Sequence, residues 1–406
     1  MQLIDLIYLV IYSIILYCSV LWFTVFFKNR GKMFKNPKPK RFPSITFLVP
    51  AYNEEKNIGR CLKAILDLNY PKKRLKIIVI DDGSKDNTVN IVKRFKGVKL
   101  IRQKNSGKAV AMNNGLKHVK TELVACMDGD SFPDKDYLLK IIGHIEKKNV
   151  AAVTSAMKAS ETGSIFQKIQ WVEYLWAIFL RKLFSIFDCQ YVIPGPGSIY
   201  KTEILKKIGG FDEKNLTEDM EIGFNIVDHG YKIGNSIDAY VYTNVPSGFK
   251  GLYKQRMRWY RGYIQNTMKY SHMVANPEYG NLGFFILPIN FLWMFILGFL
   301  LFSMILRWLW DASQYFINWS YVEFALMPLR VNVDIFFLDF YTYFWFWFLI
   351  VSLATIGLSV FYSGEKLDIK NKLKFYISYI LFYPILSSVF WIASAIYEIL
   401  RVERKW

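Results

Sequence analysis

Four long apolar segments dominate this 406-residue chain and decide its general form. The first runs from Leu6 to Phe27, and the other three cover about Leu282–Trp310, Ile335–Tyr362 and Phe375–Leu400. A helix needs about 20 apolar residues to cross a bilayer, so each segment is long enough to do so. The sequence therefore predicts an integral membrane protein with about four transmembrane helices, one before and three after a middle region of different character.

Basic residues predict the orientation in the membrane. Seven of them lie between Lys28 and Arg41, after the first apolar segment, which favours an uncleaved anchor over a secretory signal. With the basic stretch Lys366–Lys374, they place the N-terminus outside and the middle region in the cytoplasm. Four spans then put the C-terminus outside, although the basic tail 401–406 argues against that. Pro384 leaves a kinked or re-entrant last segment as alternatives.

The formal net charge of +19 restricts the class of partner. Nucleic acid, an anionic membrane surface and a phosphate-bearing substrate all fit such a charge. Because the positive charge is largely next to the apolar segments, we expect a membrane and no nucleic acid. The four cysteines match no zinc or disulfide spacing, which predicts reduced, mostly buried thiols.

The middle region, from Phe42, alternates short apolar strands with helical stretches. This pattern predicts βαβ units and a largely parallel α/β sheet, in which ligands bind at the carboxyl ends of the strands. Polar clusters follow three of the strands, at Tyr52–Glu54, Asp81–Ser84 and Asp128–Asp130. The expected strands are Ile45–Pro50, Lys76–Asp81, Val98–Arg102 and Glu122–Met127, and the expected helices are Glu55–Leu68, Asp86–Phe95 and Lys108–Val119.

Asp128 and Asp130 are the strongest candidates for chemistry. If the strand 122–127 continues through them, their side chains point the same way, because alternate residues share a face. Two convergent carboxylates suit Mg²⁺ or Mn²⁺, which commonly bridge to phosphates. A plain turn is the alternative, since Asp and Gly are common turn residues.

Four further segments carry candidate site residues, each with a plainer alternative. Ser106-Gly-Lys108 offers amide groups and a cation to a phosphate, or it is an ordinary helix start. The aromatic and basic stretch Ile165–Phe187 suits a helix in the membrane interface, or plain core. Ile193–Tyr200, rich in glycine and proline, is a pocket wall or a connector. Thr217-Glu-Asp219 begins a helix whose acidic residues favour its dipole in any case.

The last such segment is Gln255-Arg-Met-Arg-Trp-Tyr-Arg261, which combines three arginines with two aromatic residues. Arg258 is placed to grip a diphosphate and Trp259 to stack on a sugar ring. A basic, aromatic helix on the membrane surface is the alternative interpretation.

The order of these clusters resembles the membrane-integrated, processive family 2 glycosyltransferases, which include hyaluronan, chitin, cellulose and poly-N-acetylglucosamine synthases. The resemblance covers roughly Phe42 to Arg261, and the layout is most similar to nodulation-type chitooligosaccharide synthases. Each motif alone is weak, but their shared order is specific. The motifs are Val49-Pro-Ala-Tyr-Asn-Glu-Glu55, Asp81-Asp-Gly-Ser84, Gly107-Lys108, Asp128-Gly-Asp130, Gly209-Gly-Phe-Asp212, Thr217-Glu-Asp219 and Gln255-Arg-Met-Arg-Trp259.

This resemblance implies a GT-A fold and an inverting transfer from a nucleotide sugar, such as UDP-N-acetylglucosamine, to a growing glycan. Asp219 would be the general base, with Glu218 as the next candidate, and Asp128 and Asp130 would hold the metal. The implied donor-binding residues are Pro50, Tyr52, Glu54, Asp82, Lys108, Asp128, Asp130 and Arg258. The implied acceptor-binding residues are Gly195, Gly197, Glu218, Gln255 and Trp259.

The resulting expectation is an anchor and linker over 1–41, a cytoplasmic GT-A domain over 42–250, an interfacial segment over 251–281 and a membrane region over 282–406. Two other functions remain open: a polyprenyl-phosphate sugar synthase with a lipid acceptor, and a membrane protein that binds nucleotide sugars without catalysis. The sequence also leaves open the sugar, the product length, export by the chain itself and the oligomeric state.

Overall fold

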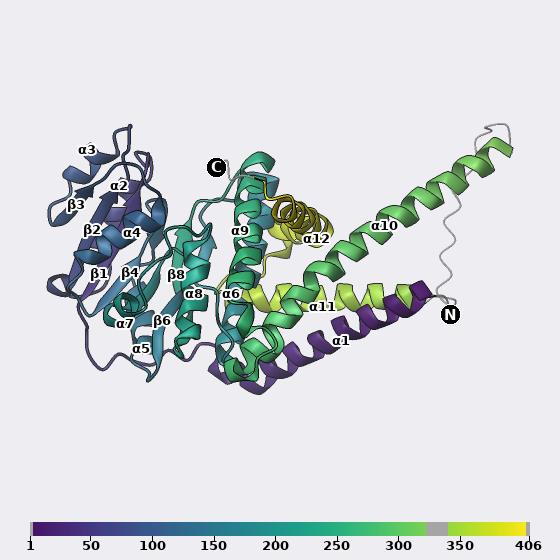
Figure 1. Ribbon diagram of the computed structural model, residues 1–406, viewed down its shortest axis with the longest axis horizontal. Helices are drawn as coiled ribbons and strands as arrows, with labels where there is room; N and C mark the ends of the chain where they lie inside the picture. The colour runs from purple at the N-terminus through teal and green to yellow at the C-terminus, as the bar shows by residue number, and fades with distance from the viewer. Residues whose placement is uncertain (1–2, 322–339, 403–406) are drawn as a thin grey trace.

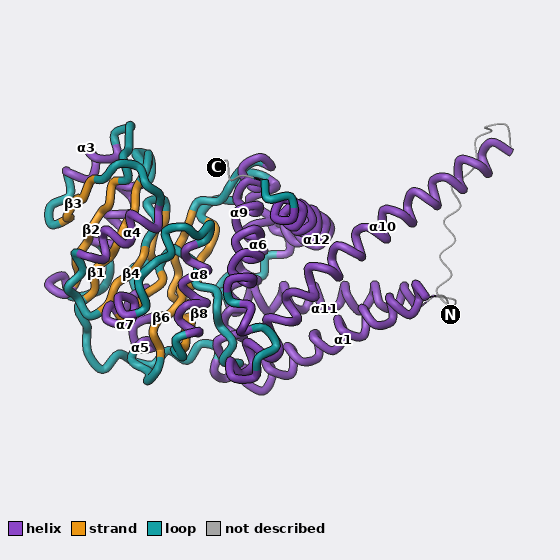
Figure 2. The backbone as a smooth tube through the Cα atoms, viewed as in Figure 1, coloured by secondary structure: helices purple, strands orange, loops and turns teal. Residues whose placement is uncertain are grey.

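An α/β domain and a group of long helices make up the two ends of the molecule (Figures 1 and 2). The computed structural model describes residues 3–321 and 340–402. The expected start of a span at Ile335 and residues 403–406 of the basic tail lie outside the described residues.

The α/β domain contains an eight-stranded sheet in the order β3-β2-β1-β4-β7-β6-β8-β5. Its first four strands are parallel, which confirms the βαβ units predicted between residues 45 and 127. The remainder is mixed, because β7 runs antiparallel to both β4 and β6, and β5 antiparallel to β8. The strands are β1 Ile45–Ala51, β2 Leu75–Asp81, β3 Val98–Arg102, β4 Leu123–Cys126, β5 Ser131–Pro133, β6 Val150–Ala159, β7 Ser198–Lys201 and β8 Lys232–Thr243.

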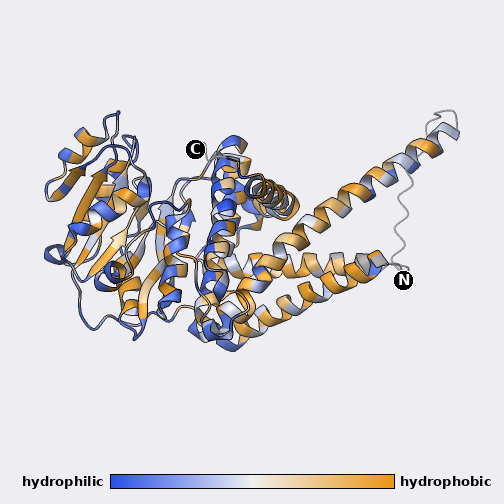
Figure 3. Cartoon of the chain, in the orientation of Figure 1, coloured by the Kyte–Doolittle hydropathy of each residue, from blue (hydrophilic) through white to orange (hydrophobic). Residues whose placement is uncertain are grey.

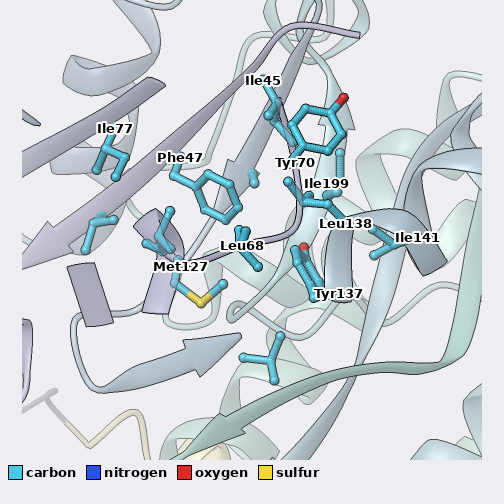
Figure 4. Packing of buried hydrophobic residues seen from close by; sticks show 14 of the residues in the cluster. Ile45, Phe47, Leu68, Tyr70, Ile77, Met127, Tyr137, Leu138, Ile141 and Ile199 are labelled. Atoms are coloured by element: carbon cyan, nitrogen blue, oxygen red, sulfur yellow. The ribbon is translucent and has the colours of Figure 1, made fainter. Parts of the chain in front are cut away.

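Two hydrophobic clusters, one on each face, hold the helices of this domain onto the sheet. Neighbouring residues of β1 point to opposite faces, so Phe47 belongs to the cluster in Figure 4 and Leu48 to the other. Both are fully buried, and each burial contributes roughly 1.5–3 kcal/mol. The helices are α2 Ile58–Leu66, α3 Thr88–Lys93, α4 Lys108–Lys117, α5 Tyr137–Ile145, α7 Thr202–Lys207 and α8 Glu218–Asp228.

Three helices, α6 (Ile165–Ile186), α9 (Phe249–Lys269) and α12 (Ile369–Ile399), join the domain to the rest of the molecule. A capping box between Ser164 and Gln167 starts α6, which packs against β6 and β8 as well as α11 and α12. Helix α12 crosses both α6 and α9 and is seen nearly end-on in Figure 1.

Among the described residues, three helices are long and apolar enough to cross a membrane, at Ile4–Lys32, Leu282–Tyr321 and Ile369–Ile399, which indicates a membrane protein. They correspond to α1 (Leu3–Asn29), to α10 (Leu287–Tyr321) with the π-helical turn before it, and to α12. The fourth expected span is α11 (Phe340–Tyr362), whose described apolar stretch, Phe346–Tyr362, is shorter. Figure 3 shows these helices as mostly hydrophobic.

Helix α12 begins and ends beside the same part of the molecule. The loop before it contacts the sheet, where Glu365 pairs with Lys158 of β6 at 2.8 Å. At its other end Glu398 pairs with Arg261 of α9, which also donates to the Val402 carbonyl at 2.9 Å. The helix is continuous through Pro384. The last described residues therefore lie beside α9, whereas four successive spans predict a C-terminus on the far side.

Candidate active site

Asp128 and Asp130 lie in a turn after β4. The strand ends at Cys126, and the Ser131 N–H donates to the Asp128 carbonyl at 3.0 Å. The strand alternation that predicts a common direction for the two carboxylates therefore does not extend to them. Both nevertheless line one cavity, because the turn itself presents them to it.

Glu54 lies beside this turn and adds a third carboxylate. A Cβ at Gly129 would lie 3.1 Å from Glu54 Cγ and 3.6 Å from the Pro50 carbonyl oxygen, so a glycine permits this close approach. Burial, then the charges of Asp128 and Glu54, raise the pKa of Asp130 to about 7. Burial also raises the pKa of Glu54, although Asn57 donates to it at 3.0 Å. Negative charge therefore accumulates here.

This acidic turn fits a divalent cation. Carboxylate oxygens are the hard ligands that Mg²⁺ and Mn²⁺ prefer, and a cation would relieve the repulsion that raises the pKa of Asp130. In residues 3–321 and 340–402 no group of three or more His, Cys, Asp or Glu side chains is arranged to hold a metal. Asp128 and Asp130 alone would leave coordination positions for oxygens of a ligand.

Lys108, the first residue of α4, connects the acidic turn to α8. Its Nζ lies 2.6 Å from Asp128 Oδ1 and 3.3 Å from Glu218 Oε1. Burial disfavours its charge, but Asp128, Glu218 and Asp219 outweigh that and raise the pKa of Lys108. The lysine therefore remains a cation in the cavity.

Asp219 lies in the first turn of α8. Its Oδ1 accepts from the Met220 N–H at 2.9 Å and its Oδ2 from the Gly195 N–H at 3.2 Å. Burial, then the charge of Glu218, raise the pKa of Asp219 to about 6. The carboxylate is thus mostly ionised at neutral pH, although its pKa is higher than that of a free aspartate. Thr217 occupies the N-cap position without a capping side-chain bond, since its hydroxyl accepts from Asn266 of α9.

Asp82 organises a loop. Its two carboxylate oxygens accept from the N–H groups of Ser106 and Gly107, each at 2.9 Å, and from the Gln103 amide at 2.8 Å. The amides that the sequence offers to a phosphate are therefore occupied by Asp82, and Lys108 is the group of this segment that lines the cavity.

Tyr52 and Pro50 lie at the end of β1, near the turn that follows β2. Tyr52 has an exposed ring, and the next residue, Asn53, has a φ of 55°. The Ser84 hydroxyl accepts from the Asn53 N–H at 2.9 Å, which joins the two strand ends. The predicted clusters after β1 and β2 are therefore in contact.

The Pro194–Tyr200 segment forms a wall of the cavity before it enters β7. A Cβ at Gly195 would lie 3.0 Å from Lys108 Nζ and 3.3 Å from Asp219 Oδ2, so the backbone passes directly over these groups. Gly197 has a φ of 74°, and its N–H donates to the Cys126 carbonyl at 2.7 Å. These contacts fix the wall to the strand that precedes Asp128.

Helix α9 presents Gln255, Arg258 and Trp259 to the cavity. Arg256, between them, is buried, and its Nη2 lies 2.7 Å from Glu173 Oε2 on α6. Its guanidinium lies 4.2 Å from the centroid of the Trp259 ring. The Tyr383 hydroxyl of α12 donates to Glu173 Oε1 at 2.8 Å. Three helices therefore meet in one polar network beside the indole.

One cavity of about 870 Å³ connects the acidic turn, the loop wall and α9. Its lining includes Lys108, Asp128, Asp130, Gly195, Asp219, Gln255, Arg258 and Trp259. The candidate residues Pro50, Tyr52, Glu54, Asp82, Gly197 and Glu218 are not among its lining residues. The cavity begins at the acidic end formed by Lys108, Asp128, Asp130 and Asp219 and passes α9. It continues between helices that contribute aromatic side chains. They include Trp22 of α1, Trp293 of α10, Trp347 of α11 and Tyr383 of α12.

The candidate residues predicted from the sequence include those of the acidic end. They do not include the network of Glu173, Arg256 and Tyr383. The available signal was a lone acidic residue in the apolar stretch of α6, which requires a cationic partner when buried. The sequence does not indicate that Arg256 is that partner.

Comparison with known proteins gives consistent matches. Residues 46–209 match the model of the family described as glycosyl transferase family 2. A poly-β-1,6-N-acetyl-D-glucosamine synthase of Staphylococcus epidermidis is 33% identical over 240 residues, which cover 58% of each chain. The synthase of Staphylococcus aureus strain COL is 31% identical over 262 residues, 61% of this chain and 63% of the relative. The matches therefore span about three fifths of these relatives.

Among solved structures, a mannosyltransferase from Pyrobaculum calidifontis in complex with GDP-Man and Mn²⁺ has a TM-score of 0.60. The alignment covers 97% of this chain and 99% of the other, at 19% identity. At that identity the likeness concerns the fold, and the predicted GT-A architecture is confirmed.

Proposed function

We propose that this chain, which carries a family 2 glycosyltransferase domain over residues 46–209, is an inverting membrane glycosyltransferase that extends a polysaccharide or oligosaccharide from a UDP-sugar. The observation that carries the proposal is the single cavity joining the acidic end to aromatic walls between the membrane helices. Such a cavity has room for a donor and for several sugar units of an acceptor. The similarity to poly-N-acetylglucosamine synthases supports UDP-N-acetylglucosamine as a donor.

The donor would bind at the strand ends. Tyr52, Pro50 and Glu54 are placed for the nucleoside, and Asp82 acts through the loop whose amides it binds. Mg²⁺ or Mn²⁺, held by Asp128 and Asp130, would supply positive charge to the departing diphosphate. Lys108 and Arg258 add their own charges from opposite elements, and such prepositioned charge stabilises the negative charge that develops in the transition state.

Asp219 is the proposed general base. An acceptor hydroxyl attacks the anomeric carbon, its proton passes to the Asp219 carboxylate, and the bond to the diphosphate breaks, so that one displacement inverts the configuration. With a pKa of about 6, the carboxylate is mostly ionised yet basic enough to take the proton. The Gly195 and Met220 N–H groups orient it.

The acceptor would lie along α9. Trp259 offers its ring face to a sugar, and Gln255, whose Oε1 is buried without a hydrogen-bond partner among the described residues, offers an acceptor to a hydroxyl. Gly195 and Gly197 keep the loop wall close to the terminal sugar. Glu218 borders this site through its contact with Lys108.

The α/β domain, expected over 42–250, would face the cytoplasm, with the N-terminus outside. The interfacial segment then starts slightly earlier than residue 251, at Phe249 where α9 begins. We place α12 at the membrane surface, because both of its ends contact the α/β side, so that α1, α10 and α11 cross the bilayer. The last described residues are then cytoplasmic, in agreement with the basic tail. The cavity between the crossing helices is also a route by which the chain could export its product.

The test is to supply purified full-length protein with a panel of labelled nucleotide sugars and Mg²⁺ or Mn²⁺, and then to size and digest the product. We expect a polymer or oligomer containing N-acetylglucosamine. A single sugar on a polyprenyl phosphate with every donor would refute the proposal in favour of a lipid acceptor. A polymer without N-acetylglucosamine would refute only the choice of sugar.

A further inference from the structure

One arginine of the cavity has two buried nitrogen atoms without a hydrogen-bond partner among the described residues. Arg181 lies near the end of α6, and its side chain lines the cavity. Its Nε and Nη2 atoms are buried and have no hydrogen-bond partner among the described residues. Burial lowers the pKa of Arg181 to about 10, so the side chain remains charged at neutral pH.

The other buried arginines nearby are paired. Arg256 of α9 has Glu173, and Arg261 has Glu398. A buried charge without a counter-charge is costly, and proteins generally pair such groups or reserve them for a ligand. The exceptional state of Arg181 therefore indicates that an anion from outside the chain completes its environment.

This anion site is distinct from the acidic end of the cavity. Lys108 forms ion pairs with Asp128 and Glu218, whereas Nε and Nη2 of Arg181 have no hydrogen-bond partner among the described residues. A donor diphosphate held at the acidic end already has Lys108 and Arg258 beside it. Arg181 is therefore available to a second oxyanion.

Other lining residues of the same cavity indicate the rest of the ligand. Trp347 of α11 also lines the cavity, and its Nε1 is buried without a hydrogen-bond partner among the described residues. Both orphaned groups are donors, so the ligand must offer acceptor oxygens. Apolar walls of this cavity come from the long apolar helices, including Phe26 of α1 and Met294 of α10. A ligand that combines acceptor oxygens with an apolar body fits the chemistry of a phosphate-bearing lipid.

We propose that Arg181 is the phosphate-binding residue of a lipid subsite in this cavity. The headgroup phosphate of an anionic membrane phospholipid accepts hydrogen bonds from Nε and Nη2, and its acyl chains lie against the walls from α1 and α10. The forked guanidinium matches two phosphate oxygens at once. No bond is made or broken, so this lipid is a bound component and not the sugar acceptor.

The test compares full-length wild-type protein with Arg181→Gln and Arg307→Gln in nanodiscs. Arg307 is an exposed basic residue of α10 that does not line the cavity, so it controls for general loss of charge. Binding is measured with labelled phosphatidylglycerol in a phosphatidylcholine bilayer. Arg181→Gln should weaken binding by about tenfold or more, the usual size of a charged hydrogen-bonding contact. Arg307→Gln should leave binding unchanged.

Three outcomes would overturn this inference. Equal binding by both variants would remove Arg181 from the site. Competition by inorganic phosphate at the lipid's own concentration would make the ligand a free anion. A shorter glycan product from Arg181→Gln with unchanged lipid binding would assign Arg181 to the glycan.

Thermal unfolding in detergent separates a lipid subsite from a structural role. Without phosphatidylglycerol, Arg181→Gln should unfold at or above the wild-type temperature, because it removes an unpaired buried charge. It should also lose the stabilisation that added phosphatidylglycerol gives the wild type. A lower unfolding temperature without lipid would make Arg181 structural and refute the inference. Arg181-dependent lipid binding together with transfer of sugar to the lipid would support the subsite and refute glycan extension instead.

Discussion

Replacing Glu173 by Gln should destabilise the protein and shorten its product while leaving UDP binding intact. Glu173 Oε2 lies 2.7 Å from Arg256 Nη2, and both side chains are buried. Breaking a buried ion pair by neutralising one partner commonly costs about 3–5 kcal/mol, because the other charge remains buried. Arg256 lies 4.2 Å from the Trp259 ring centroid, so its displacement should also loosen the indole that we propose holds the acceptor.

Two further variants make this prediction quantitative. Tyr383→Phe removes one hydrogen bond to the same carboxylate and should cost less, about 1.5–3 kcal/mol. The double variant Glu173→Gln with Arg256→Met removes both charges and should be more stable than Glu173→Gln alone. The assays are unfolding in detergent, labelled-UDP binding, and gel sizing of the product.

Additive losses of stability in the double variant would refute the proposed coupling between Glu173 and Arg256. If the double variant loses the sum of the two single losses, Glu173 and Arg256 are not energetically coupled. If Glu173→Gln keeps wild-type product length despite its lower stability, the network does not position Trp259.

Four other predictions address the remaining groups. Asp130→Ala should abolish transfer and metal-dependent UDP binding, with a loss of about 10²-fold or more in rate, and full activity in chelator would contradict the metal site. Asp219→Asn should bind the UDP-sugar without transferring it. In the wild type, kcat should be constant above about pH 7 and should fall about tenfold per pH unit well below pH 6. The reason is that protonation of Asp219, with a pKa of about 6, removes the base. A kcat that stays constant down to pH 5 would assign the base to another residue. Trp259→Ala should reduce elongation far more than donor hydrolysis, whereas equal losses would argue against a role in holding the glycan. In sealed right-side-out vesicles, protease sites near Asn90 and Lys147 and a tag placed after the C-terminus should all be protected until lysis; cleavage of the tag alone would show that α12 crosses the bilayer.

The local sequence determined the first half of the sheet and the composition of the acidic end. Strands β1, β2 and β4 contain apolar runs that end at polar turns, and such runs are typical of buried strands. Strand β3, Val-Lys-Leu-Ile-Arg, is less apolar and has no fully buried residue, as expected for the edge of the sheet. The carboxyl ends of parallel strands share one edge, so the clusters after β1 and β2 were expected to meet, as they do.

Tertiary structure decided the groups that depend on contacts between distant segments. The loop 193–200 crosses Asp219 because β7 runs antiparallel beside β4, a pairing that no local pattern specifies. Burial and the charge of Glu218 raise the pKa of Asp219, although its place in a helix first turn suggests the opposite.

The placement of α12 relative to the membrane also depends partly on the sequence and partly on the tertiary structure. The sequence alone identifies α12 as apolar, because hydropathy depends only on amino-acid composition. Whether such a helix crosses the bilayer or lies on its surface depends on what its two ends contact. For α12 those contacts are Lys158 with Glu365 before the helix and Arg261 with Glu398 at its end, and each joins residues more than a hundred positions apart in the sequence.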